Sequence, residues 1–164
     1  MKLLKTDKVL IAGQQGTGKT ELMKFLVNQY KRITRVVILD PHNEVHIPGV
    51  KTFYKDEKQI LWKCWKVGNC MIAIDEAHRI FRRTPQPLSG ILGYIANMAR
   101  HRNIGYILVT PRIQQLHGDV IAPCTKYFLF RMMFPRDQDY LSEFVGDVAY
   151  NLGSLPNHHF IYFD

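Results

Sequence analysis

The chain has 164 residues, 46% of them hydrophobic, so it has the length of one domain and enough apolar residues for a packed core. Its formal net charge of +8 suits a phosphate-rich partner such as nucleic acid, without establishing one. The N-terminus lacks the apolar core of a secretory signal, no apolar run is long enough to span a membrane, and the three cysteines form no CxxC pair. We therefore expect one cytoplasmic domain over residues 1–164, with no direct membrane insertion.

Short apolar runs alternate along the chain with segments of helical periodicity, which indicates an α/β fold with a mainly parallel central sheet and helices on both faces. Strands are expected at Lys8–Gly13, Arg35–Asp40, Cys70–Asp75, Ile104–Thr110, Lys126–Met132 and His159–Phe163. Helices are expected at Glu21–Arg32, Asp56–Trp65, Ile91–Arg102 and Pro135–Asp147. Two prolines and a Ser-Gly pair make Phe81–Gly90 a loop, and the aromatic rings of Trp62, Trp65 and Phe81 are expected to pack against the core.

The segment GQQGTGKT lies between the first expected strand and the first expected helix. Its spacing is that of a phosphate-binding loop, in which glycines let backbone N–H groups turn toward the β-phosphate of a nucleotide and the following helix adds its positive end. Lys19 is expected to reach the β- and γ-phosphates, and the Thr20 hydroxyl to bind Mg²⁺. The residues expected to contact ATP are Gly13, Gln14, Gln15, Gly16, Thr17, Gly18, Lys19, Thr20 and Glu21.

Two adjacent acids, Asp75 and Glu76, end the apolar run CMIAI, where open α/β sheets bind their ligands. Asp75 is expected to hold Mg²⁺ through water, because this ion takes few protein carboxylates. Glu76 is placed to orient or deprotonate the water that attacks the γ-phosphate. A GTPase switch does not need that glutamate, and the base-reading motif Asn-Lys-x-Asp is absent. A pair of solvated acids at a strand end is the structural alternative, but the preceding phosphate-binding loop favours ATP hydrolysis.

An ordered set of motifs resembles the HerA/FtsK superfamily of P-loop motor ATPases. The set is GQQGTGKT, LDPHNE (Leu39–Glu44), IDEAHRIF (Ile74–Phe81), ARHRNIGYILVTPR (Ala99–Arg112), and FLFRM with PRDQDYLSEFVGD. The resemblance implies a RecA-like (ASCE) core with strand order 5-1-4-3-2, assembled as a ring, usually a hexamer, that moves double-stranded DNA through its centre. The compact chain is most similar in character to viral genome-packaging ATPases, which implies the host cytoplasm and a capsid or portal-vertex protein as a further partner.

The chain departs from this family at the tip of the fourth expected core strand. The family commonly has Thr-Gln there as a polar sensor of the γ-phosphate, whereas this sequence reads Thr110-Pro111. Proline has no side-chain hydrogen-bonding group, so Thr110 is the expected sensor; Gln114 is the alternative, although an ordinary surface glutamine is the simpler interpretation of that residue. Hydrolysis that is slow, or that depends on assembly, would follow from this departure.

Five arginines are candidates for contacts with phosphates. The family resemblance points to Arg100 and Arg102 as catalytic arginines delivered across a subunit interface, with Arg131 a weaker candidate. The alternative is that arginines near a helix C-terminus complement its dipole. Arg82 and Arg83, in the loop after Glu76, are candidates for sequence-independent DNA contacts, and a solvated charged loop is the alternative.

Three functions remain open from the sequence. The first is a Mg²⁺-dependent ATPase that translocates double-stranded DNA, either packaging a viral genome or acting as a HerA-like plasmid or cellular translocase. The second is a Zot-like virion assembly or extrusion ATPase that acts on protein partners. The third is a structural or regulatory subunit that binds nucleotide without turnover.

Overall fold

The computed structural model describes residues 2–164, so Met1, the first residue of the predicted domain, lies outside the described residues. The strands are β1 (Lys8–Ala12), β2 (Arg35–Leu39), β3 (Lys51–Phe53), β4 (Cys70–Ile74), β5 (Ile104–Thr110), β6 (Lys126–Phe130) and β7 (Phe160–Phe163). The α-helices are α1 (Lys19–Tyr30), α2 (Glu57–Val67), α3 (Gly90–Met98), α4 (Gly118–Ile121) and α5 (Pro135–Val145). Short 3₁₀ turns are η1 (Ala77–Arg79), η2 (Ala99–Arg102), η3 (Ile113–Gln115) and η4 (Gly146–Ser154).

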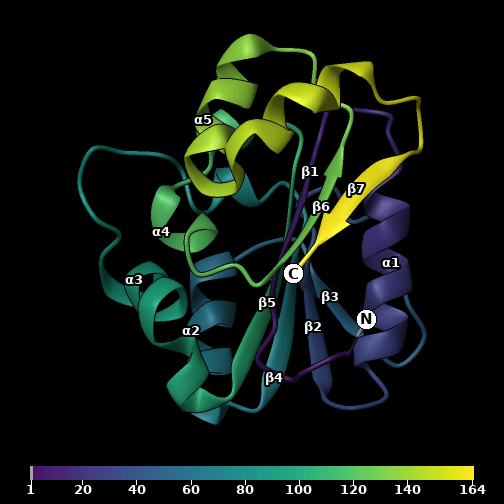
Figure 1. Cartoon of the computed structure of the whole chain (residues 1–164). Helices are drawn as coiled ribbons and strands as arrows, with labels where there is room; N and C mark the ends of the chain where they lie inside the picture. Colours follow the sequence, from purple (N-terminus) through teal and green to yellow (C-terminus); the bar gives the residue numbers. More distant parts are fainter. Residues whose placement is uncertain (1) are drawn as a thin grey trace.

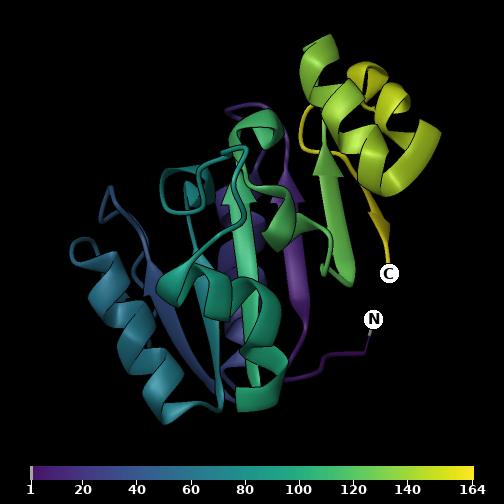
Figure 2. The same cartoon turned by 90° about the vertical axis from the view of Figure 1, so that its left-hand side faces the viewer.

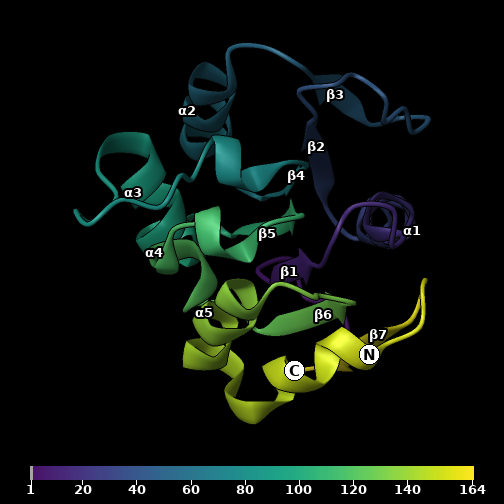
Figure 3. The ribbon, with the colours of Figure 1, turned by 90° about the horizontal axis from the view of Figure 1, so that it is seen from above.

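The strands form one sheet in the order β3-β2-β4-β5-β1-β6-β7, which Figure 3 shows from top to bottom. Neighbours from β3 to β6 pair in parallel, and β7 pairs antiparallel with β6. Without the edge strands β3 and β7, the remaining five strands have the order 5-1-4-3-2 when numbered along the chain. The α/β fold and the strand order expected from the sequence are therefore confirmed.

Helices cover both faces of the sheet. Helix α1 packs on one face, and α2, α3 and α4 pack on the other (Figures 1 and 3). Two apolar clusters fill these layers, one around Met23 and Tyr30 of α1 and the other around Leu61 and Ile95 of the opposite helices. Every residue of β1, β4 and β5 is buried, which explains why these strands read as continuous apolar runs.

The parallel strands bring several loops to one edge of the sheet. Ala12 pairs with Thr110, and Leu39 pairs with Ile74, so the residues that follow β1, β2, β4 and β5 all emerge at the carboxyl edge. Helix α5 and η4 lie together beyond this edge, next to β6 and β7 (Figure 2). The carboxyl edge is therefore where the motifs found in the sequence meet.

Four local expectations were wrong. Strand β3 was not predicted, because its three residues form a partly exposed edge strand without an apolar pattern. The helix expected to reach Arg102 ends at Met98 and continues as the 3₁₀ turn η2. Helix α5 is followed by η4, which was not predicted. Trp62 is 40% exposed because it lies on the outer side of α2, with its ring edge-on to Tyr94 at 5.8 Å.

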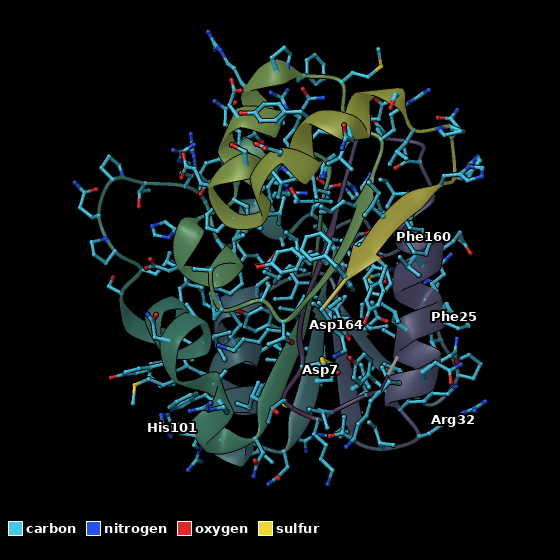
Figure 4. The ribbon with its side chains drawn as sticks, viewed as in Figure 1. Asp7, Phe25, Arg32, His101, Phe160 and Asp164 are labelled. Carbon is cyan, nitrogen blue, oxygen red and sulfur yellow. The ribbon has the colours of Figure 1, made fainter. Side chains whose placement is uncertain are left out.

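A polar cluster, in which Asp7 and Lys126 are buried and Asp164 is half exposed, joins the two ends of the chain near the opposite edge of the sheet. The Lys126 ammonium lies 3.2 Å from Asp7 and 4.0 Å from Asp164, and the Tyr30 hydroxyl donates a hydrogen bond of 2.6 Å to Asp7. In the view of Figure 4, Asp7 and Asp164 are labelled near each other, below the carboxyl-edge loops. This cluster ties the N-terminal segment and α1 to the strand that pairs with β7.

Candidate active site

The segment from Gly13 to Thr20 forms the turn between β1 and α1. Gly13, Gly16 and Gly18 have positive φ angles of 148°, 76° and 98°, which L side chains rarely adopt. Gly18 directly precedes the first residue of α1, so the N-terminal end of that helix faces the loop. The loop therefore has the backbone form that lets its N–H groups turn toward an anion.

Lys19 is folded into this loop. Its side chain is buried, and its ammonium donates a hydrogen bond of 2.7 Å to the carbonyl of Gln14, which also accepts a bond of 2.8 Å from the Thr17 hydroxyl. Burial lowers the pKa of Lys19, and the carboxylates of Glu76 and Asp75 oppose that shift. The cation therefore lies in the concave side of the loop, within the field of the two acids.

Gln14 is held from the other side by Arg131. The Gln14 N–H donates to the Arg131 carbonyl at 2.9 Å. With the Gln14 amide oriented so that its oxygen faces Arg131, the guanidinium donates two hydrogen bonds, of 2.9 and 3.1 Å. Arg131 thus braces the phosphate-binding loop of its own chain, a role that the sequence did not suggest.

Asp75 and Glu76 follow β4 beside the loop. The Thr20 hydroxyl lies 3.4 Å from Asp75 Oδ2, and Asp75 Oδ1 accepts a bond of 2.9 Å from the Glu76 N–H. Glu76 has a φ of 50°, a left-handed conformation that costs a non-glycine residue about 1–3 kcal/mol and is concentrated at functional sites. The two predicted magnesium ligands and the predicted water-activating glutamate therefore lie together.

The electrostatics of Asp75 favour a bound cation. Burial raises the pKa of this carboxyl above its usual value, and the charges of Glu76 and Asp40 raise it further, while the hydrogen bond from the Glu76 N–H and the charge of Lys19 oppose the shift. A hydroxyl and a carboxylate oxygen this close are hard ligands of the kind that Mg²⁺ takes, with waters and nucleotide phosphates supplying the rest. The residues present therefore fit Mg²⁺.

A cavity of about 600 Å³ opens over these groups, a size within the range of small-molecule sites. Its lining residues are Gln15, Gly16, Gly18, Lys19, Thr20, Glu21, His42, Glu44, Asp75, Glu76, Pro111 and His158. His42 and Glu44 come from the loop after β2, which is shaped by the buried Asp40 carboxylate. Asp40 accepts three backbone N–H bonds of 2.6 to 2.9 Å from this loop.

Three lining residues were missed as site residues from the sequence. His42 and Glu44 were noted only as part of a family motif. His158 reaches the cavity from the loop before β7, and a Cβ added at Gly18 would lie 3.3 Å from its Nδ1 atom. No sequence signal connects Gly18 with His158. The two residues are brought together because β7 returns antiparallel to β6.

The predicted sensor Thr110 is fully buried at the end of β5, whereas Pro111 lines the cavity. The Thr110 hydroxyl lies 3.3 Å from Nδ1 of His78. The imidazole of His78 lies in turn 3.5 Å from Glu76 Oε2. Thr110 therefore connects to Glu76 through His78, and its role as a sensor stays a prediction.

The candidate arginines occupy two different parts of the molecule. Arg100 and Arg102 precede β5 and so lie at the amino edge of the sheet, opposite the cavity; Arg102 donates to the carbonyls of Trp65 and Lys66 at 3.2 and 2.7 Å. A catalytic role for either one therefore requires a second subunit and stays a prediction. Arg82 and Arg83 line a separate cavity at the carboxyl edge. Among residues 2–164, no helix is long and apolar enough to cross a membrane.

Comparisons with known proteins agree with this geometry. The model of the family described as ATPase family associated with various cellular activities (AAA) matches residues 9–132. Over 90 residues, 52% of the chain, the sequence is 32% identical to the protein named Probable DNA double-strand break repair helicase HerA of Methanocaldococcus jannaschii. The match covers 18% of that protein, so the chain spans less than a fifth of its length.

Two solved structures share the fold. The genome packaging NTPase B204 from Sulfolobus turreted icosahedral virus 2, in complex with AMPPCP, has a TM-score of 0.82 at 22% identity, with 99% of this chain and 94% of that chain covered. The N-terminal domain of zonular occludens toxin from Neisseria meningitidis has a TM-score of 0.57 at 18% identity, with 75% of each chain covered. The resemblance inferred from the motifs is confirmed by these similarities.

Proposed function

Because this chain belongs to the ATPase family associated with various cellular activities (AAA), we propose that it is a Mg²⁺-dependent motor that hydrolyses ATP to translocate double-stranded DNA, packaging a viral genome. The observation that carries the enzymatic part is the approach of the Thr20 hydroxyl to Asp75 at 3.4 Å, with Glu76 next to it on the wall of the same cavity. The similarity in fold to a genome packaging NTPase over 99% of the chain supports the packaging part.

In this proposal each residue has a defined task. Backbone N–H groups of the phosphate-binding loop and the Lys19 ammonium hold the β- and γ-phosphates, which requires Lys19 to leave the Gln14 carbonyl. Thr20 and Asp75 would hold Mg²⁺, which would supply positive charge that neutralises the phosphates. Glu76 accepts the proton of the attacking water. Arg100 and Arg102 of a neighbouring subunit in a homo-oligomeric ring, a hexamer, supply the guanidinium that stabilises the transferred phosphoryl group.

Steady-state ATPase measurements with Mg²⁺ or EDTA, with and without linear duplex DNA, test the enzymatic part. Glu76→Gln should lower kcat by about 10²- to 10⁴-fold, the range of general base catalysis, while ATP still binds. Lys19→Ala should lose both binding and turnover. Lys63→Ala, an exposed lysine on α2, is the matched control. Wild-type turnover by Glu76→Gln would refute the proposal.

Native mass spectrometry with an ATP analogue and duplex DNA tests the ring, and the dependence of duplex affinity on salt reports the number of phosphate contacts. As part of the packaging function, we propose a capsid or portal-vertex protein as a further partner and the host cytoplasm as the location. The zonular occludens toxin similarity supports one other candidate, a virion assembly or extrusion ATPase acting on protein partners. ATPase activity that neither binds nor responds to duplex DNA would favour that candidate, and DNA-stimulated activity without a capsid partner would favour a HerA-like plasmid or cellular translocase.

A further inference from the structure

His78, in η1, lies between two cavities at the carboxyl edge of the sheet. Its Nε2 atom lies 3.5 Å from Oε2 of Glu76, a residue that lines the nucleotide cavity. His78 itself lines a second cavity of about 600 Å³. Its Nδ1 atom lies 3.3 Å from the hydroxyl of Thr110, which is fully buried at the end of β5. The second cavity therefore begins directly behind the residue that we propose to activate the attacking water.

The two cavities differ in the charge of their lining. The nucleotide cavity is lined by four carboxylates and one ammonium group, which belong to Glu21, Glu44, Asp75, Glu76 and Lys19. The second cavity is lined by three guanidinium groups, an imidazole and two amides, which belong to Arg79, Arg82, Arg83, His78, Gln114 and Gln115. A concave surface lined by one sign of charge concentrates ions of the opposite sign. An anion beside His78 is therefore attracted to the second cavity.

The loop that carries these arginines is held in place. The Arg83 guanidinium lies 3.8 Å from the centre of the Tyr140 ring, and the Arg83 N–H donates to the Gln115 carbonyl at 2.8 Å. Arg82 forms a β-bridge with Leu116. Guanidinium groups on a fixed backbone match the oxygens of a phosphate, which they bind through charge-assisted hydrogen bonds. The second cavity therefore suits a small anion with several oxygens.

Hydrolysis of ATP produces such an anion next to His78. Water attacks the γ-phosphorus, the bond from this atom to the β–γ bridging oxygen breaks, and Glu76 accepts a proton of the water. The products are ADP and inorganic phosphate. The phosphate then lies near the negative charges of ADP and Asp75, and repulsion between like charges favours its departure. On the side of Glu76, one side chain, that of His78, separates it from the arginines.

We propose that the second cavity binds inorganic phosphate and is the route by which this product leaves the nucleotide cavity, past His78. This proposal rests on the hydrolytic part of the proposed function and not on DNA translocation. Burial lowers the pKa of His78, the charges of Arg79 and Arg112 lower it further, and Asp75 opposes them, so the imidazole is neutral near pH 7. Its contact with Glu76 is therefore not an ion pair, and the ring moves aside without transfer of a proton.

Phosphorus NMR of orthophosphate tests the binding site, with the protein saturated with Mg²⁺ and ADP so that the phosphate-binding loop is occupied. The wild type should broaden the orthophosphate signal. The double variant Arg79→Ala with Arg82→Ala should weaken this binding by at least about tenfold, which the loss of one charge-assisted hydrogen bond is enough to give. The control, Arg32→Ala with Lys63→Ala, removes two exposed positive charges elsewhere and should bind like the wild type. Equal weakening in both double variants would reflect net charge alone and would overturn the site.

Single-turnover kinetics without DNA test the route. Acid quenching measures the cleavage of ATP, and a fluorescent phosphate sensor measures the appearance of free phosphate. The rate constant of release divided by that of cleavage should fall at least about fivefold in the arginine double variant, the effect of about one hydrogen bond. An unchanged or higher quotient would overturn the route. Arg82→Gln, which keeps N–H donors but loses the charge, decides the matter if the double variant does not fold. Its orthophosphate affinity and its quotient should both fall, and wild-type values would refute the proposal.

The failures of the two proposals are distinguishable. If the wild type cleaves no ATP, the proposed function fails and the exit route fails with it, while the orthophosphate titration still decides whether the cavity binds phosphate. If the wild type cleaves ATP and the arginine double variant binds orthophosphate equally well, only the phosphate site fails. If duplex DNA displaces orthophosphate from the ADP-bound wild type, the arginines serve the DNA backbone and the inference is overturned.

Discussion

Replacing Gly13 with alanine would place a methyl group 2.6 Å from Cβ of Phe130 and 3.0 Å from its carbonyl carbon. The clashing atoms are the backbone and Cβ of β6, which no change of side-chain rotamer can move. The φ of 148° at Gly13 adds strain for any L side chain. Overpacking and strain together should lower the free energy of unfolding by about 2–5 kcal/mol. For a chain of this length, each kcal/mol lowers Tm by about 2–4 °C.

Gly16 provides the matched control in the same loop. Its φ of 76° is also positive, but a Cβ added there would meet no atom within 4 Å. Gly16→Ala should therefore lose only the conformational part, about 1 kcal/mol. Urea unfolding followed by circular dichroism measures both variants. Equal destabilisation by Gly13→Ala and Gly16→Ala would refute the close approach of β6 to the loop as the reason for the first glycine.

Further predictions concern buried charges and strain. Asp40→Ala removes an acceptor of three backbone N–H bonds and should lower the free energy of unfolding, measured in urea, by about 2–4 kcal/mol. Asp40→Asn keeps one acceptor oxygen and should lower it less. Equal destabilisation by the two variants would contradict this prediction. Lys126→Met leaves Asp7 buried without its cation, 3.2 Å away in the wild type, and should cost about 3–5 kcal/mol, part of which Asp7→Asn should restore in the double variant. Because the folded-state pKa of His78 lies below 6.5, the unfolded chain binds a proton more readily, so stability should fall as pH decreases below 6.5. His78→Gln should reduce the pH dependence of the free energy of unfolding in this acidic range. A variant with the same pH profile as the wild type would contradict the prediction. Glu76 has a φ of 50°, so the variant Glu76→Gly should be more stable than Glu76→Ala by about 1 kcal/mol. The reverse order of stability would show that the left-handed conformation is not retained.

The parts of the fold that were predicted correctly are those in which one physical signal dominates. Strands β1, β4 and β5 are buried on both faces, so burial alone makes each of them an apolar run. The phosphate-binding loop and the pair Asp75-Glu76 directly follow two of these strands. Parallel pairing brings such positions to one edge of a sheet whatever the rest of the chain does.

The parts that were missed depend on contacts between distant segments. Strand β3 exists because its three residues pair with β2, not because of their own pattern. The exposure of Trp62 follows from which side of α2 faces the sheet, where its ring meets Tyr94 of the neighbouring helix. His158 enters the cavity because β7 returns antiparallel to β6, and only the tertiary structure determines where that return begins.

Pro111 stands where the family commonly has a glutamine, and the neighbouring turn η1 places another polar side chain, His78, beside the tip of β5. Pro111 lines the cavity without a side-chain hydrogen-bonding group, and the Thr110 hydroxyl behind it is fully buried. The left-handed conformation of Glu76 starts the tight turn η1, and the imidazole of His78 in that turn lies against the tip of β5. A polar connection from β5 to Glu76 therefore exists, but it passes through His78. A sequence motif read position by position could not reveal it, because the connection is made by a turn between two strands.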